Sequence, residues 1–223
     1  MDFEKQRQRM VQQQLVRRGI RDEAVLEAMG TVPREAFLPA DMAEMAYEDS
    51  PLPIGNGQTI SQPYIVAVMI EHLELEDGDR VLEIGTGSGY GAAVLSRIAA
   101  EIYTVERLAS LAGDARRRIQ DLGYDNVHLR VGDGSLGWPD HAPYDAELVT
   151  AGAPDIPEPL KSQLSVGGRL VIPTGRRPVV QSLVRVRKTS ASEFQREELE
   201  SVRFVPLVGE AGWQESNLPR MNR

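Results

Sequence analysis

The sequence contains no cysteine, and this absence excludes several classes of chemistry. Without thiols the chain forms no disulfide bond, carries no thiolate nucleophile and offers no cysteine ligand to zinc. Histidine is nearly as scarce, since only His72, His128 and His141 occur in the 223 residues. These three lie in separate predicted elements, so we expect neither a serine–histidine triad nor a metal site.

Basic residues and long apolar runs are also few. The chain has 25 Lys and Arg against 33 Asp and Glu, a formal net charge of −8. Proteins that bind nucleic acid nonspecifically usually present a basic face, so we expect no nucleic-acid partner. No apolar run approaches the roughly 20 residues of a membrane span, and residues 1–10 lack a signal-peptide core. We therefore expect a soluble, cytoplasmic protein. A monomer is a separate expectation, which these features do not establish.

Helical periodicity dominates the N-terminal part of the chain. Apolar residues recur on one face of a helix predicted over residues 2–18, which Gly19 can end. Asp22 is a suitable N-cap for a second, short helix, and Gly30 is predicted to stop it. Prolines then mark an irregular stretch, and another helix is predicted from Pro63. We expect the first helices to form an N-terminal cap.

After residue 79 the pattern alternates between strands and helices. Strands are predicted at 80–84, 101–106, 127–133, 146–151 and 168–173, and helices at 91–99, 108–122 and 157–164. Such alternation is typical of a doubly wound α/β fold, a mostly parallel sheet with helices on both faces. Residues 179–188 and 197–207 predict two further strands, joined by a polar turn into a C-terminal antiparallel β-hairpin.

The composition is that of an ordinary globular protein, with 41% hydrophobic and 26% charged residues. We expect a single domain over residues 1–223. In this interpretation residues 1–62 supply the N-terminal helices and a loop, residues 63–175 the α/β core, and residues 176–223 the hairpin and tail.

A glycine run lies at the first strand end of the core. The segment VLEIGTGSGYG places Gly85, Gly87 and Gly89 directly after a buried-looking strand and before a helix. Open α/β sheets bind ligands at the carboxyl ends of their strands, where glycines let the backbone approach a cofactor closely. Glu106 ends the next strand, about twenty residues on, where an acidic side chain would hold a ribose. The pattern therefore predicts a nucleotide-type cofactor.

Glu83 discriminates among such cofactors. The dinucleotide pattern G-x-G-x-x-G fails from Gly85, because Tyr90 takes the place of the third glycine. A Glu83 carboxylate would repel a pyrophosphate, whereas it would attract the ammonium and sulfonium groups of S-adenosylmethionine. We therefore expect S-adenosylmethionine, and a nicotinamide-dependent oxidoreductase is the alternative.

The third strand ends in VGDG, which adds Asp133 and Gly134 to the same rim. We expect Asp133 to accept a hydrogen bond from the adenine amino group, with the Gly134 N–H nearby. An aspartate that only starts a turn is the alternative. The two other strand ends with cofactor-type residues favour the binding role.

With these residues in place, the chain resembles the protein-L-isoaspartate O-methyltransferase family over nearly its whole length. The similar segments are VPREAFLP, AYEDSPLPIGNGQTISQPYIVAVM, VLEIGTGSGY, YTVER, GDG, YDAELVTAGAPDIPEPL, GGRLVIPTG and RFVPLVG. Many methyltransferases share the glycine run, whereas GQTISQP is far more specific. The resemblance implies a class I, Rossmann-like methyltransferase fold with a seven-stranded sheet ending in a rearranged hairpin. It also implies methylation of isoaspartyl carboxylates in damaged proteins, after which the ester collapses to a succinimide.

The resemblance also assigns site residues. Ser61 matches the family's active-site serine, and we expect its hydroxyl to aim the substrate carboxylate rather than to attack it. Gln58, Thr59 and Ile60 are expected to line the same mouth, within the cofactor-binding set, and YTVER adds Arg107 beside Glu106. Without the resemblance, the uncharged stretch GNGQTISQP would also be compatible with a surface turn.

One residue departs from the family pattern. Glu147 occupies a strand position that is usually apolar in the family. A charge in a central strand is costly unless it is paired or reaches water, so we expect Glu147 at the exposed start of its strand.

Two other functions stay open from the sequence. The same cofactor could methylate RNA or a small molecule, although the acidic chain shows neither a basic surface nor an added binding module. The second open function is a non-catalytic cofactor-binding protein. The intact motifs argue against it, since none of them is visibly degraded.

Overall fold

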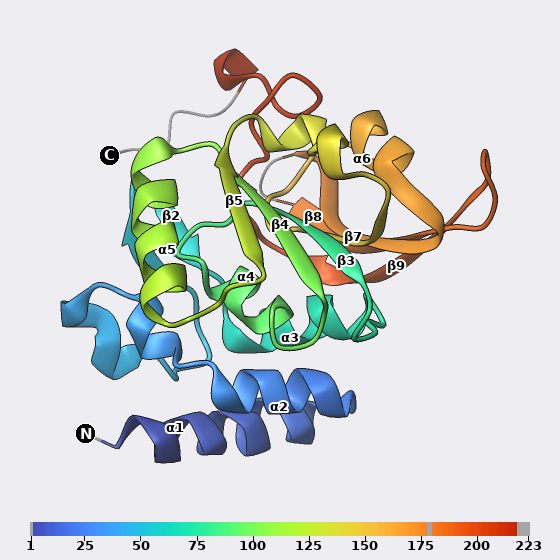
Figure 1. The fold of residues 1–223 in the computed structure, drawn as a ribbon. Helices are drawn as coiled ribbons and strands as arrows, with labels where there is room; N and C mark the ends of the chain where they lie inside the picture. Colours follow the sequence, from blue (N-terminus) through green and yellow to red (C-terminus); the bar gives the residue numbers. More distant parts are fainter. Residues whose placement is uncertain (1, 178–179, 218–223) are drawn as a thin grey trace.

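The computed structural model describes residues 2–177 and 180–217, and its centre is a seven-stranded sheet (Figure 1). The strand order is β5-β4-β3-β6-β7-β8-β9. The strands are β3 (Arg80–Ile84), β4 (Glu101–Glu106), β5 (Val127–Val131), β6 (Tyr144–Val149), β7 (Leu164–Arg177), β8 (Val180–Lys188) and β9 (Phe194–Val202). The five strands β5, β4, β3, β6 and β7 pair in parallel, which brings their carboxyl ends to one rim.

The last strands reverse direction, as the sequence predicts. β8 pairs antiparallel with β7 and with β9, and their connecting loop projects from the sheet edge (Figure 1). β7 is longer than the predicted 168–173, and β9 begins and ends earlier than the predicted 197–207. Residue 179 of the predicted strand 179–188 lies outside the described residues.

Helices cover both faces of the sheet. One face packs against α3 (Pro63–Glu71), α4 (Tyr90–Leu95) and α5 (Ala109–Asp121), which share a buried cluster with the N-terminal helices. The other face packs against α6 (Glu158–Gln163) and the short 3₁₀ helices Gly134–Leu136 and Pro139–His141. These layers confirm the doubly wound α/β class.

The N-terminal helices lie side by side beneath α3 (Figure 1). α1 (Phe3–Met10) continues as a π-helical turn and a 3₁₀ turn to Arg18, where Gly19 at φ +106° ends the helix. Asp22 caps α2 (Glu23–Thr31) by accepting a hydrogen bond from the Val25 N–H. The predicted stop at Gly30 is wrong, because Gly30 lies inside α2.

The stretch between the prolines and α3 is more ordered than the sequence indicates. It contains 3₁₀ helices at Arg34–Phe37 and Ala40–Met45 and a two-stranded sheet of β1 (Leu52–Gly55) and β2 (Gln58–Ile60). Asn56 and Gly57 form the connecting turn, both with positive φ, at 53° and 68°. Such Asn-Gly turns join strands through two residues, so a hairpin forms here without alternating apolar residues.

Glu147 corrects the prediction of an exposed strand start. Its side chain is 0% exposed in the middle of β6, in register with Leu82 of β3 and Leu170 of β7. Neither carboxyl oxygen has a hydrogen-bond partner among the described residues. Burial therefore raises the pKa of Glu147 well above its ordinary value, and the charge of Lys188 opposes this only in part.

Candidate active site

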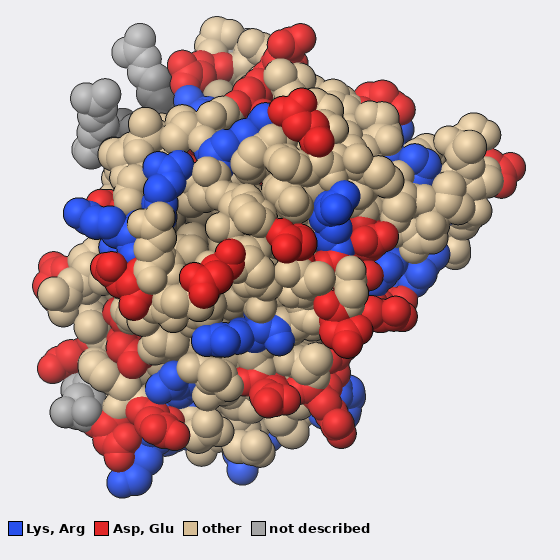
Figure 2. All heavy atoms as spheres, viewed as in Figure 1, with Lys and Arg blue, Asp and Glu red and all other residues tan. Residues whose placement is uncertain are grey.

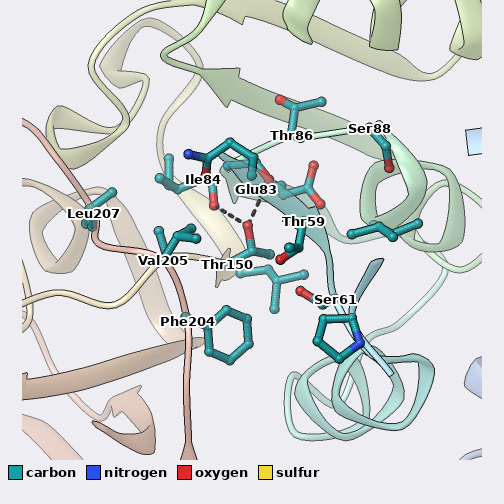
Figure 3. Close-up of a pocket in the computed structure, with 18 of the residues that line it drawn as sticks. Thr59, Ser61, Glu83, Ile84, Thr86, Ser88, Thr150, Phe204, Val205 and Leu207 are labelled. Atoms are coloured by element: carbon teal, nitrogen blue, oxygen red, sulfur yellow. Dashed lines mark hydrogen bonds between the residues drawn. The ribbon is translucent and has the colours of Figure 1, made fainter. Parts of the chain in front are cut away.

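A cavity of about 1050 Å³ opens at the carboxyl ends of β3, β4 and β6 (Figure 3). The hairpin β1–β2 and the start of α3 form one wall, and residues 201–208, from the end of β9 onward, form another. The strand ends and the glycine run form the floor. The opening loop, the glycine run and the end of β4, which carry residues predicted from sequence, therefore meet here.

The glycine run forms a cradle that side chains would fill. Gly85, Gly87 and Gly89 have φ of +94°, +55° and +96°, a region that residues with a Cβ rarely adopt. A Cβ at Gly85 would lie 2.4 Å from the Thr150 hydroxyl, which donates hydrogen bonds to backbone carbonyls of β3 and the glycine run. At Gly91 a Cβ would lie 2.2 Å from Glu83 Oε1. No side chain fits at these positions, and the backbone of Gly85, Gly87 and Gly91 itself lines the cavity.

Glu83 lies on the cavity floor although it is 1% exposed. Thr104 of β4 donates a hydrogen bond of 2.6 Å to Glu83 Oε2, and the Thr104 and Thr86 hydroxyls lie 2.6 Å apart. Burial raises the pKa of Glu83 to about 8; the Thr104 hydrogen bond lowers it and the Glu106 charge raises it. The carboxyl group is thus poised to ionise when a cation enters.

Glu106 holds the ends of two loops together. Its Oε2 accepts the Gly87 N–H at 2.9 Å, and its Oε1 accepts the Leu108 N–H at 2.9 Å. Each carboxylate oxygen can accept further hydrogen bonds, so ribose hydroxyls remain compatible with these contacts. The neighbouring Arg107 also lines the cavity, and its guanidinium forms a 2.7 Å ion pair with Glu215.

Asp133 and Gly134 have different surroundings. Gly134 lines the cavity, where a Cβ would lie 2.5 Å from Ile84. Asp133 is not part of the cavity lining; its carboxylate accepts hydrogen bonds from Ser135 and from the Glu210 N–H of the C-terminal segment. The adenine contact of Asp133 therefore stays a prediction that would require one of these carboxylate oxygens to be shared.

The opening loop brings its predicted residues to the cavity. Gln58, Thr59, Ile60 and Ser61 all line it, with Ile60 buried beneath. Figure 3 shows the hydroxyl groups of Thr59 and Ser61 pointing to the middle of the pocket. Ser61 lies where β2 ends and α3 begins, so two regular elements fix its position.

The sequence interpretation missed several lining residues. Thr150 directly follows β6 and lines the cavity, and the rule that ligands bind at strand ends would have found it. Thr104 of β4 is not in the lining and acts on the site through its hydrogen bond to Glu83. The apolar side chains of Phe204, Val205 and Leu207 form the wall opposite the loop (Figure 3). The segment RFVPLVG was noted for its resemblance alone, because no local pattern shows that it returns to the rim.

The donor set fits S-adenosylmethionine. Two carboxyl groups, Glu83 and Glu106, lie where cationic and hydroxyl groups of the cofactor would need partners, and Ile84, Leu108 and Leu148 give an apolar surface for a base. Within the described part of the chain, no group of three His, Asp or Glu side chains could hold a metal ion. The polar groups that can act here belong to the side chains and backbone of the cavity.

Comparisons with known proteins agree with this geometry. The family model "Protein-L-isoaspartate(D-aspartate) O-methyltransferase" matches residues 5–212. "Protein-L-isoaspartate O-methyltransferase 1" of Geotalea uraniireducens is 65% identical over 207 residues, which cover 93% of this chain and 94% of the relative.

Solved structures show the same similarity. A protein-L-isoaspartate O-methyltransferase has a TM-score of 0.82 at 33% identity, covering 92% of this chain and 67% of that chain. A putative protein-L-isoaspartate O-methyltransferase from Plasmodium falciparum, in complex with S-adenosyl-L-homocysteine, has a TM-score of 0.79 at 26% identity and covers 91% of this chain and 98% of its own. The chain belongs to the protein-L-isoaspartate (D-aspartate) O-methyltransferase family.

Proposed function

We propose that this protein transfers a methyl group from S-adenosylmethionine to the carboxylate of isoaspartyl residues in other proteins. Family membership supports the reaction, and the position of Ser61 and Thr59 at the mouth of a cavity with two buried carboxyl groups supports it independently. The product ester would collapse to a succinimide that can reopen to normal aspartate, so the reaction begins repair.

The cofactor is proposed to lie along the glycine run. Gly85, Gly87 and Gly134 line the cavity and would let the backbone contact it, while Glu83 and Glu106 would bind its amino and ribose groups. Gly89 is not in the lining and faces Ala115 and Ile119 of α5, so it would serve the turn into α4. S-adenosylmethionine supplies an electrophilic methyl group carried on a sulfonium. The residues of the chain then have to hold the acceptor in line with that group and to exclude water.

The acceptor needs little acid–base help. An isoaspartyl carboxyl group has a pKa of roughly 4, so it is already an ionised nucleophile at neutral pH. Negative and positive charges cancel as the methyl group moves, so a strong cation beside the carboxylate would stabilise the ground state more than the transition state. Neutral hydrogen-bond donors can position the oxygens without that disadvantage.

The loop offers such donors. The Ser61 hydroxyl is proposed to hydrogen-bond the acceptor carboxylate, and Thr59 stands beside it on the same side of the cavity (Figure 3). Neither hydroxyl has to give up its proton in this mechanism. Ser61 therefore acts as a positioning group that touches the substrate.

Partners and location follow from the same proposal. Isoaspartyl proteins and peptides would be the substrates, and the protein would act in the cytoplasm as a monomeric single domain. No helix in the described ranges is long and apolar enough to cross a membrane. On the face shown in Figure 2, Lys and Arg lie among Asp and Glu instead of forming a continuous basic surface. This mixture favours a protein acceptor over RNA.

The test is transfer of labelled methyl from S-adenosylmethionine to a synthetic peptide with one isoaspartate. The same peptide with normal aspartate, a cellular RNA extract and a small-molecule extract serve as comparisons. We expect an alkali-labile ester on the isoaspartyl peptide alone. Label on RNA or a small molecule, with none on either peptide, would replace this proposal by the alternative acceptor.

A further inference from the structure

The turn that closes the active-site hairpin is an Asn-Gly sequence with open surroundings. Asn56 is exposed at the tip, and both Asn56 and Gly57 have positive φ. A Cβ added at Gly57 would meet nothing within 4 Å, so no neighbour packs against this peptide bond. Among the described residues, the Asn56 side chain makes one hydrogen bond, of 3.3 Å from Nδ2 to the Ser110 hydroxyl of α5.

Two other sites of this kind, Asn126–Val127 and Asp133–Gly134, are restrained by packing, whereas the exposed Asp77–Gly78 carries no side-chain amide to lose. The Asn126 amide donates to the carbonyls of Ser96, Ala99 and Ala100 at 3.1–3.2 Å, and a branched residue, Val127, follows it. At the Asp133–Gly134 bond, the carboxylate is held by Ser135 and the Glu210 N–H, and Gly134 packs against Ile84.

We propose that Asn56–Gly57 is a site of spontaneous deamidation that converts the protein's own active-site loop into an isoaspartyl form. The Gly57 backbone nitrogen attacks the Asn56 side-chain carbonyl carbon, and a C–N bond forms as Nδ2 leaves as ammonia with the proton from Gly57. Water then opens the resulting succinimide. Opening at the main-chain carbonyl of residue 56 leaves the chain running through the former side chain.

This change alters the hairpin that carries Ser61. The backbone gains a methylene group in a two-residue turn that sets the pairing of Gly55 with Gln58. The amide that contacts Ser110 is lost, and a carboxylate is added at the tip. The hairpin also packs over the glycine run, since a Cβ at Gly87 would lie 3.4 Å from Ile54. Both the cofactor and the Ser61 hydroxyl therefore lose a fixed wall.

Repair of this isoaspartyl lesion requires a second molecule. Asn56 is not part of the cavity lining, and its side chain contacts α5 outside it. A chain cannot bring its own hairpin tip to its own Ser61 while that hairpin forms the cavity wall. Resting on the proposed function, the inference is that an intact copy methylates residue 56 of a deamidated copy.

The first experiment ages the full-length protein without cofactor at 37 °C and mildly alkaline pH. Peptide mapping by mass spectrometry follows the amide-to-acid mass gain at Asn56, with Asn126 as the internal control. Activity on the synthetic isoaspartyl peptide is measured in parallel. We expect conversion at Asn56 first, with activity falling in proportion to the converted fraction. Equal conversion at Asn126, or an unchanged Asn56, overturns the site.

The matched variant is Asn56→Gly, because glycine adopts positive φ and has no amide to lose. It should show the activity of the fresh protein and keep it through ageing. Equal loss of activity in the variant would show that Asn56 is not the cause. Asn56→Gln, whose longer side chain closes the ring much less readily, checks the result if the glycine hairpin folds poorly.

The repair step has its own readout. Aged protein is mixed with fresh Asn56→Gly enzyme and labelled S-adenosylmethionine, and the label is mapped. We expect label on the peptide containing residue 56, and none there when the aged protein is itself Asn56→Gly. Fresh enzyme that labels the synthetic peptide but not the aged chain overturns repair alone. Fresh enzyme that labels neither overturns the proposed function, while the mass measurement still reports on deamidation.

Discussion

Two glutamates are buried in adjacent central strands, but their carboxyl groups differ in hydrogen bonding and in access to the cavity. Glu83 of β3 and Glu147 of β6 are 1% and 0% exposed, and burial raises the pKa of both. Glu83 receives a hydrogen bond from Thr104 and lines the cavity. Neither oxygen of Glu147 has a partner in the described part of the chain, and apolar neighbours surround it.

Their positions explain the difference. Glu83 is in register with Leu148, and Glu147 with Leu82, so alternation points the two side chains to opposite faces of the sheet. Glu83 faces the α4 side beneath the open cavity, next to Gly91. Glu147 faces the closed core under α6. A buried carboxyl group is therefore useful where a ligand can reach it, and is only a cost where none can.

The largest expected effect comes from removing the carboxylate that lines the cavity and holds the glycine run to the end of β4. Glu106→Gln would set an amide NH₂ against one of two backbone N–H donors, from Gly87 or Leu108. Both charge-assisted hydrogen bonds that hold the glycine run weaken, and the ribose loses its carboxylate partner. We therefore expect the binding free energy of the cofactor to fall by about 2–4 kcal/mol, which is a roughly 30- to 1000-fold higher Kd. Calorimetry measures it, with Glu101→Gln as the control, since Glu101 is half-buried at the opposite end of the same strand and lies outside the cavity lining.

Glu83→Gln should have the next largest effect, and it changes pH dependence. With its pKa at about 8, free Glu83 is protonated at neutral pH, and a bound cation favours ionisation. Cofactor affinity should therefore rise as pH increases toward 8 and level off above it. The variant should bind about 10- to 100-fold more weakly above that pH, if the charge contributes about 1.5–3 kcal/mol, and lose the pH dependence. A Kd that follows pH equally in both proteins would contradict the role of Glu83.

Replacing Glu147 should act on stability alone. Its ordinary pKa of 4.5 applies to the unfolded chain, whereas the folded value is raised. The neutral form is favoured by folding, so stability is complete below pH 4.5 and is lost as pH rises toward the folded pKa. Glu147→Leu removes this loss, and we expect the free energy of unfolding to increase by about 1–3 kcal/mol at neutral pH.

Denaturant unfolding at two pH values tests this expectation. The gain from Glu147→Leu should be larger at pH 7 than at pH 4, while methyl transfer stays unchanged. Glu147→Gln separates charge from packing, because its amide remains buried without partners and should gain less. If the leucine variant were less stable at pH 7, Glu147 would have a partner that the structure does not reveal.

Much of the core was predictable from the sequence because strand and helix periods dictate it. The strands around Glu83 and Glu106, the N-cap Asp22 and the glycine run all lie where local pattern predicted them. The carboxyl-end rule then placed the cavity correctly.

Three features depended on contacts distant in sequence. The β1–β2 hairpin is held by turn chemistry at Asn56–Gly57 and by packing on the glycine run, neither of which produces an alternating pattern. The 201–208 wall returns to the rim only through the topology of β8 and β9. The burial of Glu147 could not be predicted, since a charged residue in a strand normally indicates a solvent-exposed position.

The most direct test of the account is one comparison on Ser61→Ala, measuring turnover on the isoaspartyl peptide and calorimetric Kd for S-adenosylmethionine. Loss of one hydrogen bond from the hydroxyl to the acceptor carboxylate, about 1.5–3 kcal/mol, predicts a roughly 10- to 100-fold lower kcat, with the cofactor Kd within about twofold of wild type. Turnover at the wild-type rate would contradict the role given to Ser61 and, with it, the proposed purpose of the loop.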